Sequence, residues 1–432
     1  MGQWFPDAEL PMLKGIPQPR RADLTARALA YQNPRLPIPM RLAALLPFAR
    51  MWWPLDAAAL KAKARRRTRL EDFGTLAPLD EPLERICGAL DTAELHALGR
   101  LGAHTTLLAA LRNRLRLEEL ARRRPEIFSR PVTDPVVITG LHRSGMMFLH
   151  RLLARDPRFR SLPFWEAVNP LPFEEATARA ASPDPRIKAG ARVLSFLNWG
   201  SPEMIKMADL ENDSPDEELM PLAMGFSSLF FEHLVPGRLA RYATADYAYL
   251  HRALQAMQWI RPGGPRWLLR SPQHLERFGP LTGTFPDATI VQTHRDPVRS
   301  VLSLAAMLSY GLRQSYPHPN PHLIGRHVAD LTERLLQASV RDRGAADRRF
   351  VDVHFAQLNA DPMATIRRIY AAADAELTPE TERLMTVWYP RHRRGRHGVH
   401  TYEAADFGLN VHALRERFAF YSDRYGIPRE GP

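Results

Sequence analysis

From residue 135 onward, short apolar runs alternate with stretches of helical periodicity. Residues 135–139 (PVVIT) form a largely β-branched run that ends at Gly140, and a helical pattern (MMFLHRLLARD) follows a polar loop. Three further apolar runs occupy residues 266–270, 289–294 and 350–355, separated by helical stretches. Short buried strands that alternate with helices predict an α/β fold, in which helices flank a parallel sheet.

The first 125 residues follow a different pattern. The opening segment of about 35 residues is rich in proline and lacks periodicity, which predicts an arm on the surface. In residues 81–124, leucine recurs at three- and four-residue spacing, which predicts helices. We therefore divide the chain into an N-terminal arm with a helical subdomain (1–125) and an α/β domain with helical insertions (126–432).

Residues 40–60 are markedly apolar, and a basic run at 61–69 follows them. Pro47, Arg50 and Pro54 interrupt the apolar part. Peripheral contact with a membrane through residues 40–69, or a lid over an apolar pocket, would use such an apolar face flanked by basic residues. The alternative, which we favour, is a helix packed on the core with a solvated basic face.

The balance of charge is basic. Lysine and arginine number 59 and aspartate and glutamate 47, which gives a formal net charge of +12. A positive field attracts nucleic acid, anionic lipid, acidic polysaccharide or a charged nucleotide, and the planar guanidinium group suits phosphate and sulfonate oxygens. A coding bias toward arginine, alanine and proline explains the same excess, so charge alone identifies no ligand.

Two observations bear on the cellular compartment. Cys87 is the single cysteine, which excludes an internal disulfide and a cysteine-based zinc site. The N-terminus lacks a charged region followed by an apolar core, and no apolar run approaches the ~18 residues of a spanning helix. We therefore expect a cytoplasmic protein.

A loop that begins and ends with glycine joins the first predicted strand to its helix. Glycines five positions apart let the backbone curl, so that N–H groups point at an anion, and the helix N-terminus adds its positive end. A Walker A loop would carry lysine and serine or threonine where Met146 and Met147 stand, so hydrolysis of ATP or GTP is disfavoured. We expect the loop to hold a phosphate group without a metal, with Arg143 as the cation. The candidate phosphate-binding residues are Gly140, His142, Arg143, Ser144, Gly145, Met146 and Met147.

Two further basic segments follow the loop. Residues 292–303 (QTHRDPVRSVLS) close a strand and open a helix, with Asp296 as the predicted N-cap and Pro297 at the first helical position. Residues 393–398 (RRGRHG) form a basic run, which in isolation is typical of a solvated face. A nucleotide with phosphates at both ends needs two separated cationic sites, and these segments supply candidates for the second.

The segment GLHRSGMMFLHRLLARDPRFRSLPFWE resembles the 5′-phosphosulfate loop of the PAPS-dependent sulfotransferases (PAPS, 3′-phosphoadenosine-5′-phosphosulfate). It is most similar to their bacterial branch, whose core is like that of the tyrosylprotein sulfotransferases. The likeness covers residues 130 to 425, approximately. It implies a sheet of the P-loop type and metal-independent, in-line transfer of the PAPS sulfonate to a hydroxyl of a small or medium-sized acceptor. Nucleic acid is not an expected partner.

The resemblance also implies which residues hold the 3′-phosphate. The family places an arginine at the strand end and a serine eight residues later, which match Arg295 and Ser303. Its late basic-basic-glycine loop matches Arg393, Arg394 and Gly395. One departure lies in the first loop, where the family carries two threonines that bind the 5′-phosphate and this chain carries two methionines.

Candidate catalytic residues follow from the chemistry of sulfonate transfer. Charge accumulates on the leaving phosphate, so cations are needed along the reaction axis, and we assign Arg143 and Arg270. Glu166 matches the catalytic base of the tyrosylprotein branch and stands beside aromatic residues that could raise its pKa; structural pairing with an arginine of the loop is the alternative. His274 is the second candidate base, and a structural histidine in a helix cap is equally consistent. The acidic stretch 209–218 contains no calcium-loop spacing, and Glu217 or Glu218 could brace a site arginine.

Three functional hypotheses remain open. The first is an active sulfotransferase, for which the apolar stretches 40–60 and 219–234 indicate a hydrophobic alcohol or phenol as acceptor. The second is a sulfotransferase-fold protein that binds a nucleotide or a partner without turnover, because methionine replaces both threonines. The third is a basic protein that binds nucleic acid or acidic polysaccharide.

Overall fold

The computed structural model describes residues 24–33, 35–173, 183–208, 210–239, 247–344, 349–392 and 401–431. The helices before the sheet are α1 (Ala26–Gln32), α2 (Ile38–Ala44), α3 (Ala49–Trp52), α4 (Ala57–Thr68), α5 (Asp80–Asp91) and α6 (Ala97–Arg123). The later ones are α7 (Met146–Leu153), α8 (Phe164–Val168), α9 (Pro185–Gly200), α10 (Glu203–Ala208), α11 (Leu219–Ala223), α12 (Leu229–Leu234), α13 (Ala248–Ile260), α14 (Phe278–Thr284), α15 (Pro297–Leu312), α16 (Pro321–Asp342), α17 (Phe355–Ala360), α18 (Pro362–Ala372), α19 (Pro379–Trp388), α20 (Val411–Arg417) and α21 (Ala419–Tyr425).

The described residues form a five-stranded sheet in the order β2-β5-β1-β6-β7, and every paired strand is parallel. All four apolar runs predicted from the sequence are strands, and the two-residue β2 is an addition. The strands are β1 (Val136–Gly140), β2 (Phe159–Arg160), β5 (Arg266–Arg270), β6 (Thr289–His294) and β7 (Phe350–His354). The predicted α/β fold with helices around a parallel sheet is confirmed.

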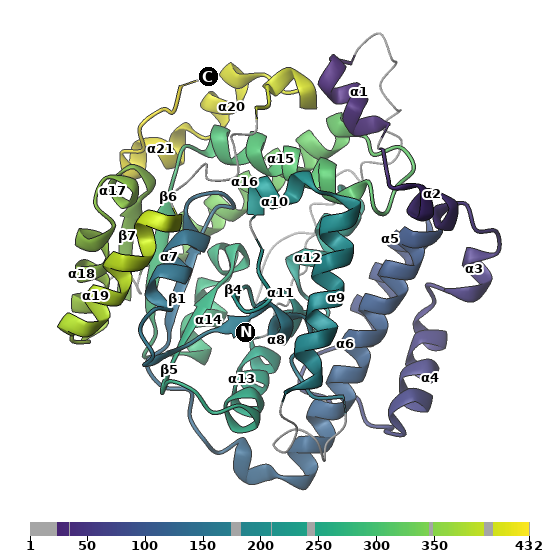
Figure 1. Cartoon of the computed structure of the whole chain (residues 1–432), viewed down its shortest axis with the longest axis horizontal. Helices are drawn as coiled ribbons and strands as arrows, with labels where there is room; N and C mark the ends of the chain where they lie inside the picture. Colours follow the sequence, from purple (N-terminus) through teal and green to yellow (C-terminus); the bar gives the residue numbers. More distant parts are fainter. Residues whose placement is uncertain are drawn as a thin grey trace, which may run out of the picture.

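Helices cover both faces of this sheet (Figure 1). Side chains of a strand alternate between the faces, so Val136 and Ile138 pack with α7, α18 and α19, whereas Val137 packs with α13, α15 and α16. The register pairs Ile138 with Arg270 and Gly140 with Thr293. The carboxyl ends of β1, β5 and β6 therefore meet at one edge of the sheet, where the predicted phosphate loop begins.

A second apolar core lies among the N-terminal helices. It joins α4, α5 and α6 to buried residues of the 219–235 segment, Phe226 and Phe231 among them. The segment is divided into α11 and α12, with Phe226 between them at a φ of +53°. The predicted boundary at residue 125 stays a prediction.

A small antiparallel ladder connects two regions of the chain that matter for the site. β3 (Leu162–Pro163) pairs with β4 (Pro215–Asp216), and Leu162 lies opposite Asp216. The segment that leads into Glu166 is therefore fixed against the acidic stretch that ends at Glu218.

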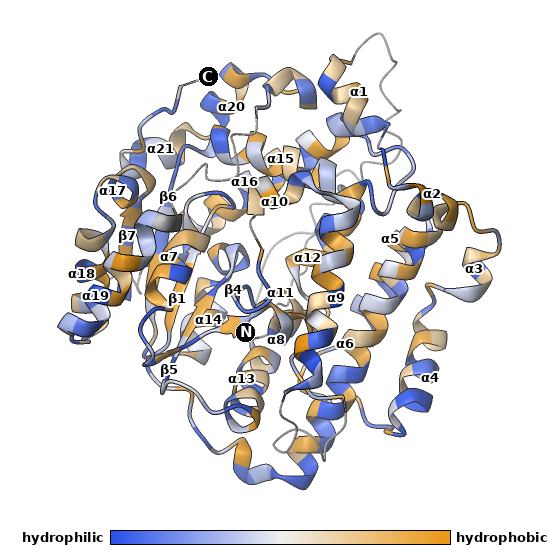
Figure 2. Cartoon of the chain, in the orientation of Figure 1, coloured by the Kyte–Doolittle hydropathy of each residue, from blue (hydrophilic) through white to orange (hydrophobic). Residues whose placement is uncertain are grey.

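The expectation of a core helix across residues 40–60 holds only for its last part. In α4, Leu60 and Ala64 are fully buried, and the basic side chains at the end of the helix remain partly or fully exposed. Helices α2 and α3 instead present apolar side chains to solvent, and Figure 2 shows this stretch as strongly hydrophobic. The exposed fractions lie between 41% and 78% for Ile38, Leu42, Leu45, Leu46, Phe48, Met51 and Trp52. None of the helices in the described ranges combines the length and the hydropathy needed to cross a bilayer.

Candidate active site

The loop between β1 and α7 depends on its two glycines. Gly140 has a φ of +153°, and a Cβ there would lie 2.1 Å from Thr293 Oγ1, so no larger residue fits without a shift of β6. Gly145 has a φ of +95° and Arg143 a φ of +70°, which turn the chain sharply before α7. Ser144 is fully buried; its Oγ donates to Leu141 O at 2.6 Å and lies 2.6 Å from Thr293 Oγ1. The loop is thus braced against the neighbouring strand.

The two methionines that follow the loop begin helix α7. Met146 is buried in the apolar layer that α7, α18 and β7 share, and Met147 is partly buried. Neither side chain can donate a hydrogen bond to a phosphate oxygen. An anion at this helix end would depend on backbone N–H groups and on Arg143.

Three of the predicted nucleotide residues lie together. Arg143 Nε donates to Ser303 Oγ at 3.2 Å, although Ser303 belongs to α15. Arg295 stands just past the end of β6, and its Nη1 donates to the carbonyl oxygen of Arg143 at 2.7 Å. Asp296 caps α15 by accepting from Val298 N, as the sequence indicated. The strand–helix corner therefore brings the Arg295 and Ser303 side chains to the phosphate loop.

The guanidinium group of Arg295 already pairs with a carboxylate of the chain. Glu430 accepts two hydrogen bonds from Arg295, at 2.5 and 2.6 Å, and its own N–H donates to Asp296. The pair is partly buried, with Glu430 27% exposed. Sequence reasoning missed Glu430, because the short C-terminal segment carries no pattern that connects it to β6.

Arg270, at the end of β5, is surrounded by carboxylates. It donates to Glu217 at 2.6 Å and to Asp216 at 3.0 Å, and its backbone N–H donates to Glu218 at 2.5 Å. Burial is the main cause that raises the pKa of Glu217 to about 7, although Arg270 opposes the shift. Burial also raises the pKa of Asp216. The expected bracing of a site arginine by the acidic stretch is confirmed.

Two histidines, the buried His150 and the partly buried His142, complete the surroundings of Arg270. Arg270 Nε donates to His150 Nδ1 at 3.2 Å, and His150 Nε2 lies 3.2 Å from the carbonyl oxygen of Leu268. Burial and the nearby guanidinium lower the pKa of His150 well below its usual value. His142 experiences both Arg143 and Arg270: burial, His233 and then these two cations lower its pKa.

His274 lies in the short 3₁₀ helix that follows β5 and is fully buried. Its Nδ1 lies 2.6 Å from the Tyr247 hydroxyl, and its Nε2 lies 3.5 Å from Glu218 Oε2. Within the described ranges, neither His274 Nε2 nor Glu218 Oε2 has a hydrogen-bond partner. Glu218 thus stands between Arg270 and His274.

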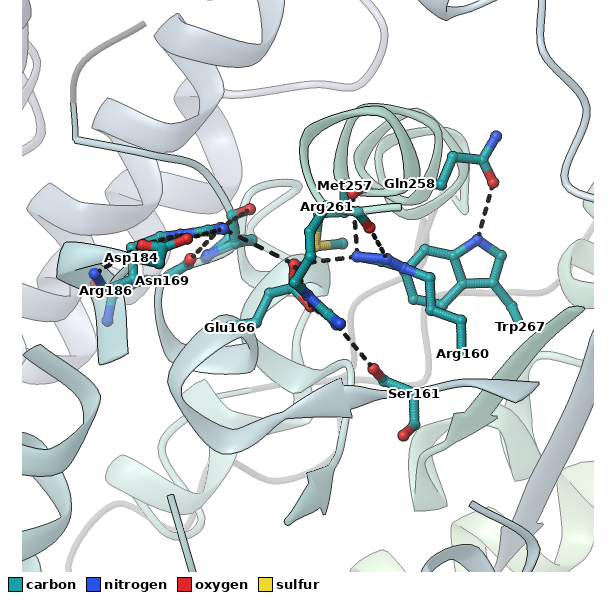
Figure 3. A network of polar contacts seen from close by, with 11 residues as sticks. Arg160, Ser161, Glu166, Asn169, Asp184, Arg186, Met257, Gln258, Arg261 and Trp267 are labelled. Carbon is teal, nitrogen blue, oxygen red and sulfur yellow. Dashed lines mark hydrogen bonds and ion pairs between the residues drawn. The ribbon is translucent and has the colours of Figure 1, made fainter. Parts of the chain in front are cut away.

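Glu166 lies in a cage of arginines, which Figure 3 shows. The carboxylate is fully buried on α8 and accepts from Arg160 at 3.1 Å and from Arg261 at 2.5 Å, while Arg186 lies 3.9 Å away. The Arg160 guanidinium stacks over Trp267 at 4.2 Å. Burial lowers the pKa of Arg160 to about 10, and Glu166 opposes this shift. The partners come from β2, from α9 and from the end of α13, rather than from the phosphate loop.

The predicted site residues therefore fall into three groups. The loop, Arg295 and Ser303 form one cluster; Arg270, the acidic stretch and His274 form a second; and Glu166 with its arginines forms a third. Arg393, Arg394 and Gly395 lie outside the described residues. No simple sequence signal links the three arginines to Glu166, because Arg160 stands 6 positions before it and Arg261 stands 95 positions after it.

Comparisons with known proteins identify the family and the fold of the chain. The sequence profile of the sulfotransferase family matches residues 135–379, which is more than half of the chain. The protein belongs to the sulfotransferase family. No curated protein matches the chain by sequence.

Two solved structures are similar along most of the chain. Sulfotransferase STF9 from Mycobacterium avium is 28% identical, with a TM-score of 0.72, over 88% of this chain and 98% of that one. Sulfotransferase STF1 from Mycobacterium tuberculosis H37Rv is 26% identical, with a TM-score of 0.67, over 84% of this chain and 98% of that one. Fold and family are those of sulfotransferase enzymes.

Proposed function

We propose that the protein transfers the sulfonate of PAPS to a hydroxyl of a small or medium-sized, apolar acceptor, without a metal ion. The observation that carries the proposal is the meeting of Arg143, Arg295 and Ser303 at the carboxyl edge of the sheet. Parallel α/β sheets bind ligands at this edge. The Glu430 carboxylate supports the fit, because an anion already pairs with the guanidinium that is assigned to the 3′-phosphate.

The residues of the chain would share the work as follows. The loop from Gly140 to Gly145, the start of α7 and Arg143 would hold the 5′-phosphate, and Ser303 and Arg295 would hold the 3′-phosphate together with Arg393, Arg394 and Gly395. PAPS supplies an activated sulfonate when it is bound. Arg143 and Arg270 would stabilise the negative charge that grows on the leaving phosphate.

We propose Glu166 as the base that accepts the proton of the acceptor hydroxyl, with His274 as the alternative. An acceptor can approach the Glu166 carboxylate most easily from the side of Arg261. The Arg261 side chain is 35% exposed, whereas those of Arg160 and Arg186 are 2% exposed or less. An acceptor would therefore reach Glu166 by displacing Arg261. His274 as base would need its Nε2, which faces Glu218, to turn toward the acceptor.

The experiment is a thermal shift with saturating PAP, the desulfated nucleotide, followed by turnover assays with PAPS and a panel of apolar alcohols and phenols. ATP and adenosine 5′-monophosphate serve as control ligands. At ~100 times the dissociation constant, PAP should stabilise the fold by about 2.7 kcal/mol. Arg295→Ala should lose most of this shift, and Arg383→Ala, an exposed arginine of α19, should keep it. Equal PAP binding by Arg295→Ala and the parent would overturn the assignment of the 3′-phosphate site.

A second candidate function is nucleotide or partner binding without turnover. The burial of Met146 in an apolar layer favours it, because the family's threonine hydroxyl is missing there. The double variant Met146→Thr, Met147→Thr separates the two functions. PAP affinity and turnover that rise only in the double variant would identify the methionines as the cause of inactivity. An active parent with an unimproved variant would exclude this second function.

We further propose that helices α2 and α3 contact an anionic membrane surface, from which an apolar acceptor could be drawn. Contiguous exposed apolar surface of this kind marks an interaction site. Residues 35–55 contain Arg35, Arg41 and Arg50 and no acidic residue, which suits anionic lipid. Helix α9 extends the apolar surface through Phe196 and others, since a Cβ at Gly200 would lie 2.9 Å from Met40 Cε.

Sedimentation with vesicles tests this membrane contact. Vesicles that contain phosphatidylserine should bind the parent more strongly than pure phosphatidylcholine vesicles do, and Leu45→Asp with Met51→Asp should abolish binding. Light scattering at the same protein concentration detects the alternative occupant, a second copy of the chain. Binding to neither vesicle, or a dimer that the double variant dissociates, would overturn the membrane assignment.

A further inference from the structure

A cavity of about 560 Å³ lies between four segments that are distant in the sequence: the end of α4, the C-terminal half of α6, residues 171–173 and the end of α13. Its lining shares no residue with the phosphate loop, with the Arg270 cluster or with Glu166 and its arginines. This volume falls within the range of roughly 300–1,000 Å³ that is usual for small-molecule pockets. The proposed sulfonate transfer assigns no role to this cavity.

One side of the cavity is strongly basic. Its described lining includes five arginines and a single carboxylate, Glu119; the arginines are Arg67, Arg69, Arg112, Arg116 and Arg123. Glu119 is already engaged, because it accepts hydrogen bonds from Arg122 and from Arg123. Arg116 donates to the carbonyl oxygen of Phe173 at 2.7 Å. The described lining therefore contains five guanidinium groups and one carboxylate.

Arg112 gives the most direct indication of a ligand. Its Nε is buried and has no hydrogen-bond partner among the residues that the structure describes. Burial lowers the pKa of Arg112, and the positive charge of Arg67 lowers it further. A buried donor without a partner destabilises the fold unless something accepts from it. An anion in the cavity would accept from Arg112 and reduce its repulsion with Arg67.

The other side of the cavity is apolar. Leu120, Leu171 and Ile260 are buried behind it, and Trp259 is partly buried at its wall. An indole ring offers a flat face for stacking and enlarges the apolar contact area. A bare inorganic anion would use only the arginines and would leave this wall without a partner.

We propose that this cavity is a binding site for an amphipathic organic anion, in which a phosphate, sulfate or carboxylate group is attached to a flat apolar body. The anionic group faces Arg112 and the neighbouring guanidinium groups, and the apolar body lies against Trp259 and the leucines. This site is independent of the nucleotide site, and its occupation requires no turnover.

Isothermal titration with 1-naphthyl phosphate tests the proposal, in the presence of saturating PAP so that the nucleotide site is closed to the probe. We expect binding at one site per chain, at least 10-fold tighter than that of 1-naphthol or of inorganic phosphate. Arg112→Met should weaken the binding of 1-naphthyl phosphate at least 10-fold and leave the affinity for PAP unchanged. It should also raise the melting temperature of the ligand-free protein, because it removes a partly buried cation whose buried Nε has no hydrogen-bond partner among the described residues. Arg383→Met, in an exposed pair on α19, is the matched control and should change neither quantity.

Each other outcome overturns a stated part of the proposal. Binding that Arg112→Met does not weaken would place the probe elsewhere, and equal binding of 1-naphthol would remove the anionic requirement. Equal binding of inorganic phosphate would remove the apolar requirement. If Arg112→Met fails to fold, Trp259→Leu provides the second variant. It should lower the affinity for 1-naphthyl phosphate about 3- to 10-fold, because aromatic stacking is lost. Probe binding that is unchanged in Trp259→Leu would overturn the proposed orientation.

Discussion

The cage around Glu166 and the cluster around Arg270 both bury charged side chains, but the numbers of acidic and basic groups are reversed between them. Glu166 is one carboxylate in contact with three guanidinium groups, whereas Arg270 is one arginine that donates to three acidic residues: its guanidinium group to Asp216 and Glu217, and its backbone N–H to Glu218. The β3–β4 ladder fixes the two clusters to each other. In the cage both oxygens of Glu166 are hydrogen-bonded to guanidinium groups that do not titrate near neutral pH. In the cluster, burial raises the pKa of Glu217 to about 7, Arg270 opposes this shift, and Asp216 and Glu218 add to it.

The difference assigns different work to the two clusters. The cage joins α8, α9 and the end of α13 through one buried carboxylate. The cluster contains Glu217, whose pKa burial raises to about 7, and lies at the end of β5, beside the proposed reaction axis. Four variants test this contrast, from the largest expected effect to the smallest.

The variant Glu166→Gln should be the most damaging. It leaves three guanidinium groups without their shared carboxylate, and removal of one member of a buried ion pair costs about 3–5 kcal/mol. Urea unfolding measures the loss, and Glu380→Gln, in an exposed pair on α19, is the control with an expected change below about 1 kcal/mol. If Glu166 is also the base, turnover should disappear while PAP still shifts the melting temperature. Turnover that survives in a folded variant would transfer the base role to His274.

The variant Glu217→Gln should remove part of the pH dependence of the free energy of unfolding. The pKa of Glu217 is about 7 in the folded protein, above the ordinary value of 4.5, so the folded state holds a proton that the unfolded state has lost. Stability from this residue therefore falls as pH rises from about 4.5 to 7, by roughly 3 kcal/mol in total. Buried neutral histidines such as His150 act in the opposite direction, because unfolding lets them take up a proton. The difference in free energy of unfolding between parent and variant, measured at pH 5 and at pH 8, isolates the contribution of Glu217. Equal differences at the two pH values would contradict the raised pKa of Glu217.

The variant Glu430→Gln should tighten nucleotide binding. Glu430 and Arg295 form a one-to-one pair, unlike either of the unbalanced clusters, and a ligand phosphate must replace this carboxylate to reach Arg295. A hydrogen bond to a charged group contributes about 1.5–3 kcal/mol, so weakening the competitor should raise PAP affinity by roughly 10-fold. Titration calorimetry with PAP measures the change. An affinity that falls instead would show that Glu430 orients Arg295 for the nucleotide.

The variant Arg261→Gln should have the smallest effect. Its side chain is 35% exposed, so solvent screens much of its attraction to Glu166, and we expect a loss of about 1 kcal/mol. Arg160→Gln, which removes a partner that is 2% exposed, should cost about 3 kcal/mol by the same reasoning as for Glu166. Chemical unfolding of both variants measures the two losses of stability, so that they can be compared. Equal losses would mean that Arg261 is held as firmly as the inner arginines.

The fold and the phosphate loop could be predicted because their signals are local. The β-branched run before Gly140 and the spacing of the two glycines each depend on a few neighbouring residues, and both appear in the structure. The partners of Glu166 and Arg295 could not be predicted, since each pairing joins segments whose proximity only the complete fold creates. For Arg270, the sequence indicated bracing by Glu217 or Glu218, but not the contacts with Asp216 and His150. The exposure of α2 and α3 was missed for another reason. An apolar pattern indicates that a segment avoids water, and it does not say whether the chain itself provides the cover.

Helix α6 connects the two apolar cores, and this has a consequence for how the chain folds. Leu107, Leu111 and Leu115 belong to the core of the N-terminal helices, whereas Leu117 and Leu120 belong to the core beneath the sheet. Neither core can lose this helix without losing part of its wall. We therefore expect the N-terminal helices and the α/β part to unfold in a single cooperative transition, and a chain that is shortened to residue 126 onward would expose apolar surface and aggregate.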